Sequence, residues 1–140
     1  MTSQHFVHRR AVLLGALLFG TIATGCGGGE SSGRVPTDCR KVSAGTDGIS
    51  KVTVVGKNLA FDVTCIEVQP GLLEVTFDNQ DSGVAHNFHI TGVGVNGKTN
   101  LEPGLVTQVL SVKLTGPGSY TFACDPHATM EGRIHVVGKG

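Results

Sequence analysis

Leu73-Glu74-Val75-Thr76-Phe77-Asp78-Asn79 alternates apolar and polar side chains. Successive side chains of a β-strand point to opposite faces, so this pattern predicts a strand with its apolar face packed inward and its polar face in water. Turn signals bound the segment, with Gln69-Pro70-Gly71 before it and Asp81-Ser82-Gly83 after it. The segment therefore predicts a fold built from short strands that end at Gly, Pro, Asn or Asp.

The same pattern extends from this segment in both directions, from about Ile49 onward. Further β-branched runs are separated by Asn96-Gly97 and Gly116-Pro117-Gly118, and no helix of useful length is apparent. The predicted strands are 51–55, 63–68, 73–79, 87–90, 106–114, 118–124 and 133–137. Many short strands separated by turns are typical of an antiparallel β-sandwich or barrel, so we expect an all-β fold.

Residues 1–25 have the composition of an export signal. Arg9 and Arg10 precede an apolar run, and small residues lead up to Cys26. The run is about 13 residues long, whereas a membrane-spanning helix needs about 20, so a permanent transmembrane anchor is not expected. Ala23-Thr24-Gly25-Cys26 resembles the bacterial lipobox, in which cleavage precedes the cysteine and its sulfur and new amino group are acylated. The alternative is plain secretion with a leftover thiol.

The paired arginines also resemble a twin-arginine export signal, and Sec export is an equal alternative. Residues 26–48 begin with a Gly/Ser-rich stretch and predict a lipidated flexible tether, followed by one folded domain over 49–140. We expect a protein anchored by lipid to the cell envelope that faces the periplasm or the exterior. Without Arg9 and Arg10, nine basic residues (11 − 2) stand against 11 acidic ones, which argues against nucleic-acid binding.

The four cysteines can each be given a separate role. Cys26 would carry the lipid, Cys39 and Cys65 would form a disulfide, and Cys124 would be a metal thiolate. Export places the chain where disulfides persist, and this bridge would join the segment before the first predicted strand to the second one. The alternatives are two reduced thiols or a disulfide that includes Cys124. The residues around Cys124 argue against the last of these.

Cys124-Asp125-Pro126-His127-Ala128-Thr129-Met130 places a thiolate, an imidazole and a thioether close together, directly after a predicted strand. A turn that leaves a strand can aim all three at one point. Thiolate and thioether are soft ligands, so the set selects copper over hard cations. A plane of two His and one Cys with a long axial Met needs one more histidine, which His86 supplies. Met130 is the only methionine left after signal removal, and core filling is its alternative role.

From about residue 51 to 137 the chain resembles the cupredoxin (type 1 blue copper) family, particularly its plastocyanin, pseudoazurin and amicyanin branch. The pieces that match are Gln69-Pro70-Gly71, an apolar strand ending in Asn79, His86-Asn87, Gly118-Ser119-Tyr120-Thr121-Phe122-Ala123-Cys124, His127, Met130 and Gly132-Arg133-Ile134. The two-residue gaps from Cys to His and from His to Met are similar to amicyanin. The resemblance implies a Greek-key β-sandwich and one copper ion that cycles between Cu(II) and Cu(I).

The resemblance also implies roles for residues beside the ligands. The Asn87 backbone amide would donate toward the thiolate, and its side chain would tie the two ligand loops together. His127 would reach an apolar surface patch and serve as the electron port. His89 lies three residues past His86 and so on the opposite face of an extended strand, which leaves a ligand role for it as a minor alternative. His135 is expected to face solvent.

We expect a one-electron carrier that is a monomer and not an enzyme, with redox proteins as donor and acceptor. Oxidases and nitrite reductases built from this fold need further copper sites, and the His-Cys-His cluster that would link them is missing. A binuclear centre would need two cysteines in the ligand loop. The alternatives are a copper-storage or delivery protein and a redox-silent adhesion domain. A delivery protein usually exposes clusters of Met and His, which the mature chain lacks.

Overall fold

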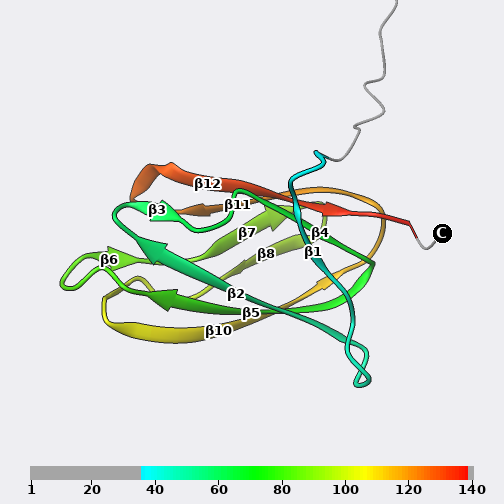
Figure 1. Cartoon of the computed structure of the whole chain (residues 1–140), viewed down its shortest axis with the longest axis horizontal. Helices are drawn as coiled ribbons and strands as arrows, with labels where there is room; N and C mark the ends of the chain where they lie inside the picture. The colour runs from blue at the N-terminus through cyan, green and yellow to red at the C-terminus, as the bar shows by residue number, and fades with distance from the viewer. Residues whose placement is uncertain (1–35, 139–140) are drawn as a thin grey trace, which may run out of the picture. The chain divides into compact units, whose positions relative to one another are not determined.

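The computed structural model describes residues 36–138, which form two packed β-sheets and a short pair of strands at one end (Figure 1). The larger sheet has the order β1 (Arg40–Val42), β4 (Cys65–Val68), β12 (His127–Val136), β11 (Gly118–Cys124), β7 (His89–Gly92) and β8 (Val95–Lys98). The smaller sheet has the order β10 (Val106–Leu114), β5 (Gly71–Asn79), β2 (Ile49–Lys57) and β3 (Ala60–Phe61). β6 (Ala85–His86) pairs with β9 (Glu102–Pro103).

The predicted all-β sandwich is confirmed, but its sheets are mixed rather than purely antiparallel. β2 pairs with β5 in parallel, and β4 is parallel to both β1 and β12. Two neighbouring parallel strands need a crossover connection, and here that connection contributes a strand to the other sheet. For example, β2 and β5 are neighbours in the smaller sheet, and β4, which lies between them in the chain, belongs to the larger sheet.

The long strands match their predicted bounds best. β10 and β11 occupy 106–114 and 118–124, as expected from the apolar and β-branched runs and the turn signal between them. The predicted strand 87–90 is instead divided, since β6 ends at His86 and β7 begins at His89. β12 begins at His127 rather than at 133, because Cys124 pairs with His127 in a tight hairpin. Past a register shift between Ala123 and Cys124, regular pairing of β11 with β12 resumes at Glu131.

The core between the sheets contains four phenylalanines that lie directly behind the ends of β6 and β11. Phe88 and Phe122 stack with ring centroids 4.9 Å apart, and Phe61 contacts both rings edge-on or tilted. Phe122 precedes Cys124 by two residues on β11, so both side chains point to the same inner face. Phe88 follows His86 by two residues. The packed rings therefore hold both segments in place.

The N-terminal part of the described chain is attached to the larger sheet. A disulfide joins Cys39 to Cys65, as the sequence predicts, with the two Cα atoms 4.5 Å apart. The next residues form β1, although they fall within 26–48, where the sequence predicts a tether. The Arg40 guanidinium also donates to the Asp62 carboxylate at 3.0 Å and to the Thr53 carbonyl at 2.8 Å. β1 is thus fixed to both sheets.

The predicted export signal over 1–25 and the predicted lipidation of Cys26 lie outside the described residues. Within 36–138, no helix has the length and apolar character to cross a membrane.

Candidate metal centre

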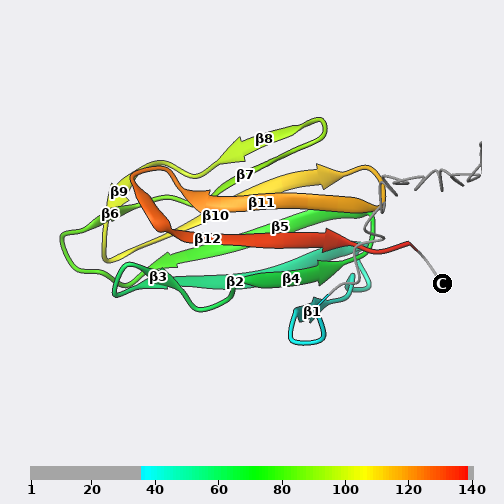
Figure 2. The ribbon, with the colours of Figure 1, turned by 90° about the horizontal axis from the view of Figure 1, so that it is seen from above.

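Three side chains from three segments meet at one end of the sandwich. Cys124 ends β11, His127 begins β12, and His86 ends β6, and Figure 2 shows the starts or ends of these strands at the same end. Cys124 Sγ lies 3.4 Å from Nδ1 of His127 and 3.6 Å from Nδ1 of His86. The two Nδ1 atoms are 3.0 Å apart. These three residues, here called the donor cluster, are three of the four that the sequence predicts as metal ligands.

The spacing of the donor cluster fits a single metal ion. Bonds of about 2.0–2.3 Å from one ion to nitrogen and sulfur would separate the donors by about 3–4 Å, as observed here. Met130, the predicted fourth ligand, is buried in β12 three residues past His127. Its methyl end lies beside β2, 3.6 Å from where a Cβ on Gly56 would stand. Thiolate, imidazole and thioether together are a donor set that suits copper.

Cys124 is the free cysteine of the described residues, and its side chain is buried. Burial raises the pKa of its thiol, and backbone amides of Asn87 and His127 that donate to the sulfur oppose the rise. Because only the thiolate binds a metal, occupation of the site would release this proton. The two amides aimed at the sulfur would then stabilise the bound thiolate.

Asn87 links the two segments that carry the donors. Its Nδ2 donates to Oδ2 of Asp125 at 2.9 Å, and the backbone amide of Asp125 donates to its Oδ1 at 2.8 Å. Asn87 follows His86 and Asp125 follows Cys124, so this pair of bonds joins the neighbours of two donors. Asn87 itself is buried. These are the contacts that the sequence leads us to expect of Asn87.

The Asp125 carboxylate is also held from the opposite side by the hairpin of β7 and β8. Its Oδ1 lies 2.7 Å from Nδ1 of His89, and its Oδ2 accepts from Lys98 at 3.0 Å. Hydrogen bonds from His89, Asn87 and Lys98, in that order, hold the pKa of Asp125 well below its usual range. The other ring nitrogen of His89 lies 2.7 Å from Oδ1 of Asn96. His89 therefore stands outside the donor cluster and supports the loop instead.

Asp81 contacts the donor cluster, a role that its sequence context did not predict. Its Oδ2 lies 2.9 Å from Nε2 of His86, on the side of the ring away from Cys124. Backbone amides of Leu59 and Asn58 and the His86 ring lower the pKa of Asp81 to about 2. Asp81 is the first residue of Asp81-Ser82-Gly83, which by itself predicts only a turn. The signal that could have found it is an acidic residue five positions before a predicted histidine ligand.

A second group of sulfur and imidazole donors lies on the larger sheet. Cys39, Cys65 and His135, here called the disulfide cluster, also place their donor atoms within 4.8 Å of one another. Its two sulfurs are bonded to each other, so neither is a thiolate available to a metal. His135 is half-buried beside the bridge, although the sequence predicts that it faces solvent.

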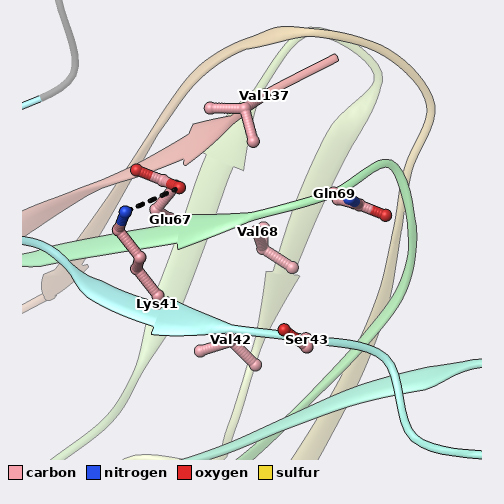
Figure 3. Close-up of a pocket in the computed structure, with 7 residues that line it drawn as sticks. All are labelled: Lys41, Val42, Ser43, Glu67, Val68, Gln69 and Val137. Carbon is pink, nitrogen blue, oxygen red and sulfur yellow. Dashed lines mark ion pairs between the residues drawn. The ribbon is translucent and has the colours of Figure 1, made fainter. Parts of the chain in front are cut away.

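A small hollow lies at the end of β12 opposite to His127, where β1 and β4 approach the last described residues (Figure 3). Its lining residues are Lys41, Val42, Ser43, Glu67, Val68, Gln69 and Val137. The charged groups of this lining face each other, with Nζ of Lys41 4.0 Å from Oε1 of Glu67. The hollow therefore offers no donor set comparable with that of the donor cluster.

Comparison with known sequences agrees with the chemistry of the donor cluster. Residues 49–137 match the family described as copper binding proteins, plastocyanin/azurin family. The chain belongs to this family. Its cofactor is accordingly one copper ion, and the soft donors gathered at the end of the sandwich fit that ion. Among curated proteins, no sequence matches this cupredoxin.

Solved structures with a similar fold include copper proteins of bacteria. Auracyanin A from Chloroflexus aurantiacus is 20% identical, with a TM-score of 0.57 over 64% of this chain and 100% of that one. An azurin from Methylomonas sp. strain J is 14% identical, with a TM-score of 0.54 over 62% of this chain and 97% of that one. A copper-containing nitrite reductase from Thermus scotoductus is 23% identical, with a TM-score of 0.52 over 64% of this chain but 23% of its own. These likenesses support the cupredoxin fold.

Proposed function

We propose that this cupredoxin is a one-electron carrier at the cell envelope, with His86, Cys124, His127 and Met130 as its copper ligands. The observation that carries the proposal is the donor cluster itself. One thiol and two imidazoles face one another within 4.8 Å, and they are held by the core and by hydrogen bonds between the segments that carry them. Such a site suits fast electron exchange, because its donors need not move when the charge of the ion changes.

Bound copper supplies the one-electron chemistry by alternating between Cu(II) and Cu(I). The contribution of the chain is rigidity. Cys124 and His127 are backbone partners in a hairpin, and the bonds between Asn87 and Asp125 join this hairpin to the segment of His86. The stacked rings of Phe88 and Phe122 support both segments from behind. Each donor is therefore anchored by its own strand and by a neighbour.

An apolar rim next to the site would suit contact with a partner protein. Leu59, Val84 and Leu105 are 48%, 36% and 75% exposed. The segments that carry them are bonded to one another around Asp81, whose carboxylate accepts the Leu59 amide and whose carbonyl accepts the Val84 amide. His127, half-buried at the same end, would be the electron port toward a redox donor or acceptor protein.

An enzymatic role is less well supported. Among residues 36–138, the donor cluster is the one metal-donor group that retains a free thiol. The nitrite reductase is matched over less than a quarter of its length, so that likeness extends to one domain of a larger protein. We therefore propose that the chain is not an enzyme. We also propose that it acts as a monomer. Copper storage or delivery is the second candidate, although Met130 is buried and offers no exposed thioether for handing copper on.

We also propose that the protein is exported and held at the envelope through a lipid on Cys26. The Cys39–Cys65 disulfide supports an extracytoplasmic location, where such bonds persist. In a bacterial host, Cys26→Ala should move the protein from the membrane fraction to the soluble fraction. A protein that stays soluble with Cys26 intact would contradict the anchor.

The deciding experiment is the visible spectrum of the copper-loaded protein before and after ascorbate. A strong thiolate-to-copper band near ~600 nm that bleaches on reduction and returns on oxidation is the expected result. His127→Ala should remove this band, whereas His135→Ala, a matched control on the same strand, should leave it unchanged. Copper uptake without the band would favour storage or delivery, and no uptake would overturn the proposed metal site.

A further inference from the structure

We propose that Asp81 is a positioning residue that fixes the orientation and tautomer of His86 and thereby lowers the reduction potential of the copper site. This inference rests on the proposed function, because a reduction potential matters only if the copper cycles. Asp81 is not one of the predicted ligands, and it acts on the metal through His86.

The contact between Asp81 and His86 decides which ring nitrogen faces the metal. Oδ2 of Asp81 lies 2.9 Å from Nε2 of His86, and the His86 side chain is fully buried. An ionised carboxylate only accepts hydrogen bonds, so Nε2 must carry the hydrogen. The lone pair of the neutral ring is then on Nδ1, the atom that faces Cys124 and His127. The carboxylate thus sets the tautomer and the orientation that His86 needs as a ligand.

Asp81 is itself held firmly by the turn between β2 and β3. Its Oδ1 accepts the backbone amide of Asn58 at 2.7 Å, and its Oδ2 accepts that of Leu59 at 3.0 Å. Asn58 and Leu59 have φ values of 54° and 56°, an uncommon conformation for residues other than glycine, which points both amides at the carboxylate. The backbone amide of Asp81 donates to Oδ1 of Asn79 at 3.0 Å. The carboxylate cannot turn away from His86 without losing two backbone hydrogen bonds.

The same turn also contacts the second ligand segment. The carbonyl of Leu59 accepts from Oγ1 of Thr129 at 3.5 Å, and Thr129 lies between His127 and Met130. The turn is therefore bonded on one side to Asp81 and on the other side to the loop that carries the remaining donors. A change at Asp81 should be felt at both halves of the site.

The charge of Asp81 should favour the oxidised ion. A carboxylate behind a ligand histidine makes the ring a stronger donor, and Cu(II) gains more from a stronger donor than Cu(I) does. Loss of outer contacts of this kind typically weakens metal binding 10–100-fold. If Asp81 strengthens Cu(II) binding tenfold relative to Cu(I), its removal should raise the one-electron potential by about 59 mV.

The test compares Asp81→Asn and Asp81→Ala with Asp62→Asn as a matched control. Asp62 also accepts a backbone amide, that of Val55 at 2.8 Å, and it pairs with Arg40, but it contacts no residue of the donor cluster. We expect both Asp81 variants to bind Cu(II) 10–100-fold more weakly, with a higher potential and an altered copper–thiolate band. Asp62→Asn should leave all three properties close to those of the unsubstituted protein.

A second measurement needs no metal. The ¹⁵N NMR shifts of the His86 ring in the metal-free protein should report hydrogen on Nε2 alone, and Asp81→Ala should lose this single tautomer. If Asp81→Ala does not fold, Asp81→Asn carries the test through the potential, because it removes the charge and keeps the size of the side chain, while its amide oxygen can still accept from Nε2.

An unchanged potential in folded Asp81→Asn, or an unchanged potential and tautomer in folded Asp81→Ala, would overturn the proposal. An equal shift of the potential in Asp62→Asn would also overturn the proposal, because the shift would then be a general effect of removing a negative charge. Failure of the unsubstituted protein to cycle would instead contradict the proposed function, and the tautomer would still decide whether Asp81 positions His86.

Discussion

The donor cluster and the disulfide cluster contain the same kinds of atoms, in each case within 4.8 Å of one another, yet they do different things. Each combines cysteine sulfur with imidazole within 4.8 Å, and each takes a histidine from β12. In the disulfide cluster, two cysteines have their Cα atoms 4.5 Å apart and are bonded to each other. In the donor cluster, a single cysteine faces two histidines and stays free. Donor type and proximity alone therefore do not define a metal site.

The contacts around the two clusters differ as much as the clusters themselves. Backbone amides donate to Cys124, and Asp81 orients His86 from behind. Among the described residues, no side-chain hydrogen bond to His135 is present to orient its ring in this way. Metal-binding histidines almost always have such an outer partner. The surrounding hydrogen bonds thus separate a site built for an ion from a bridge built for stability.

The largest expected effect is on the donor cluster. Cys124→Ser should abolish the copper–thiolate band completely, because the hydroxyl does not replace a thiolate as a soft ligand. The metal-free variant should unfold at nearly the same temperature as the metal-free parent, since a buried thiol is replaced by a group of similar size. Absorption spectra and thermal unfolding of both proteins test this. A residual band would place the thiolate elsewhere.

The second effect concerns the disulfide cluster. The double variant Cys39→Ala/Cys65→Ala should lower the free energy of unfolding by roughly 3–4 kcal/mol, because the bridge closes a loop with a sequence separation of 26 residues. Denaturant unfolding measures this loss. The visible spectrum and a stoichiometry of one copper per chain should not change. A loss of bound copper would show that the two clusters are not independent.

A smaller effect is expected from the residue that joins the ligand segments. Asn87→Ala removes both bonds to Asp125 and leaves the partly buried backbone amide of Asp125 without this partner, which should cost about 1–3 kcal/mol of unfolding free energy. The copper–thiolate band should shift because the hairpin of Cys124 loosens. Chemical unfolding and absorption spectra check the two parts separately. An unchanged spectrum would limit Asn87 to a structural role.

The smallest effect should come from His135. His135→Ala removes a half-buried ring beside the disulfide and should change the free energy of unfolding by no more than about 1 kcal/mol. Copper affinity and reduction potential should stay at their original values. Titration with copper under reducing and non-reducing conditions compares this variant with the parent. A difference between them only after reduction of the bridge would reveal metal binding by the opened disulfide cluster.

Much of this molecule could be predicted from local patterns in the sequence. The runs of strand-forming residues and the turn signal between them predicted the bounds of β10 and β11. The spacing of Cys124, His127 and Met130 indicated copper without knowledge of the fold. His86 could be found because it begins a recognisable segment. The cysteine count led to the disulfide that the structure contains.

The features that were missed depend on contacts between distant segments. β1 and β3 have three and two residues, too short for a periodic signal, and they exist because β4 and β2 pair with them. Asp81 resembles an ordinary turn residue until the turn of Asn58 and Leu59 is folded against it. The parallel pairing of β2 with β5 likewise follows from the path of the chain through both sheets. No window of neighbouring residues carries this information.

The register shift between Ala123 and Cys124 has a consequence for how this protein can vary. From Glu131 to Val136, β12 pairs residue by residue with β11, and a slip there would turn its apolar side chains out of the core. Between His127 and Glu131 no pairing with β11 fixes the register, because the intervening residues have no partner on that strand. A change in the length of this loop would therefore leave the register of β11 with β12 unchanged. Selection can adjust the loop for a new partner and leave the scaffold as it is.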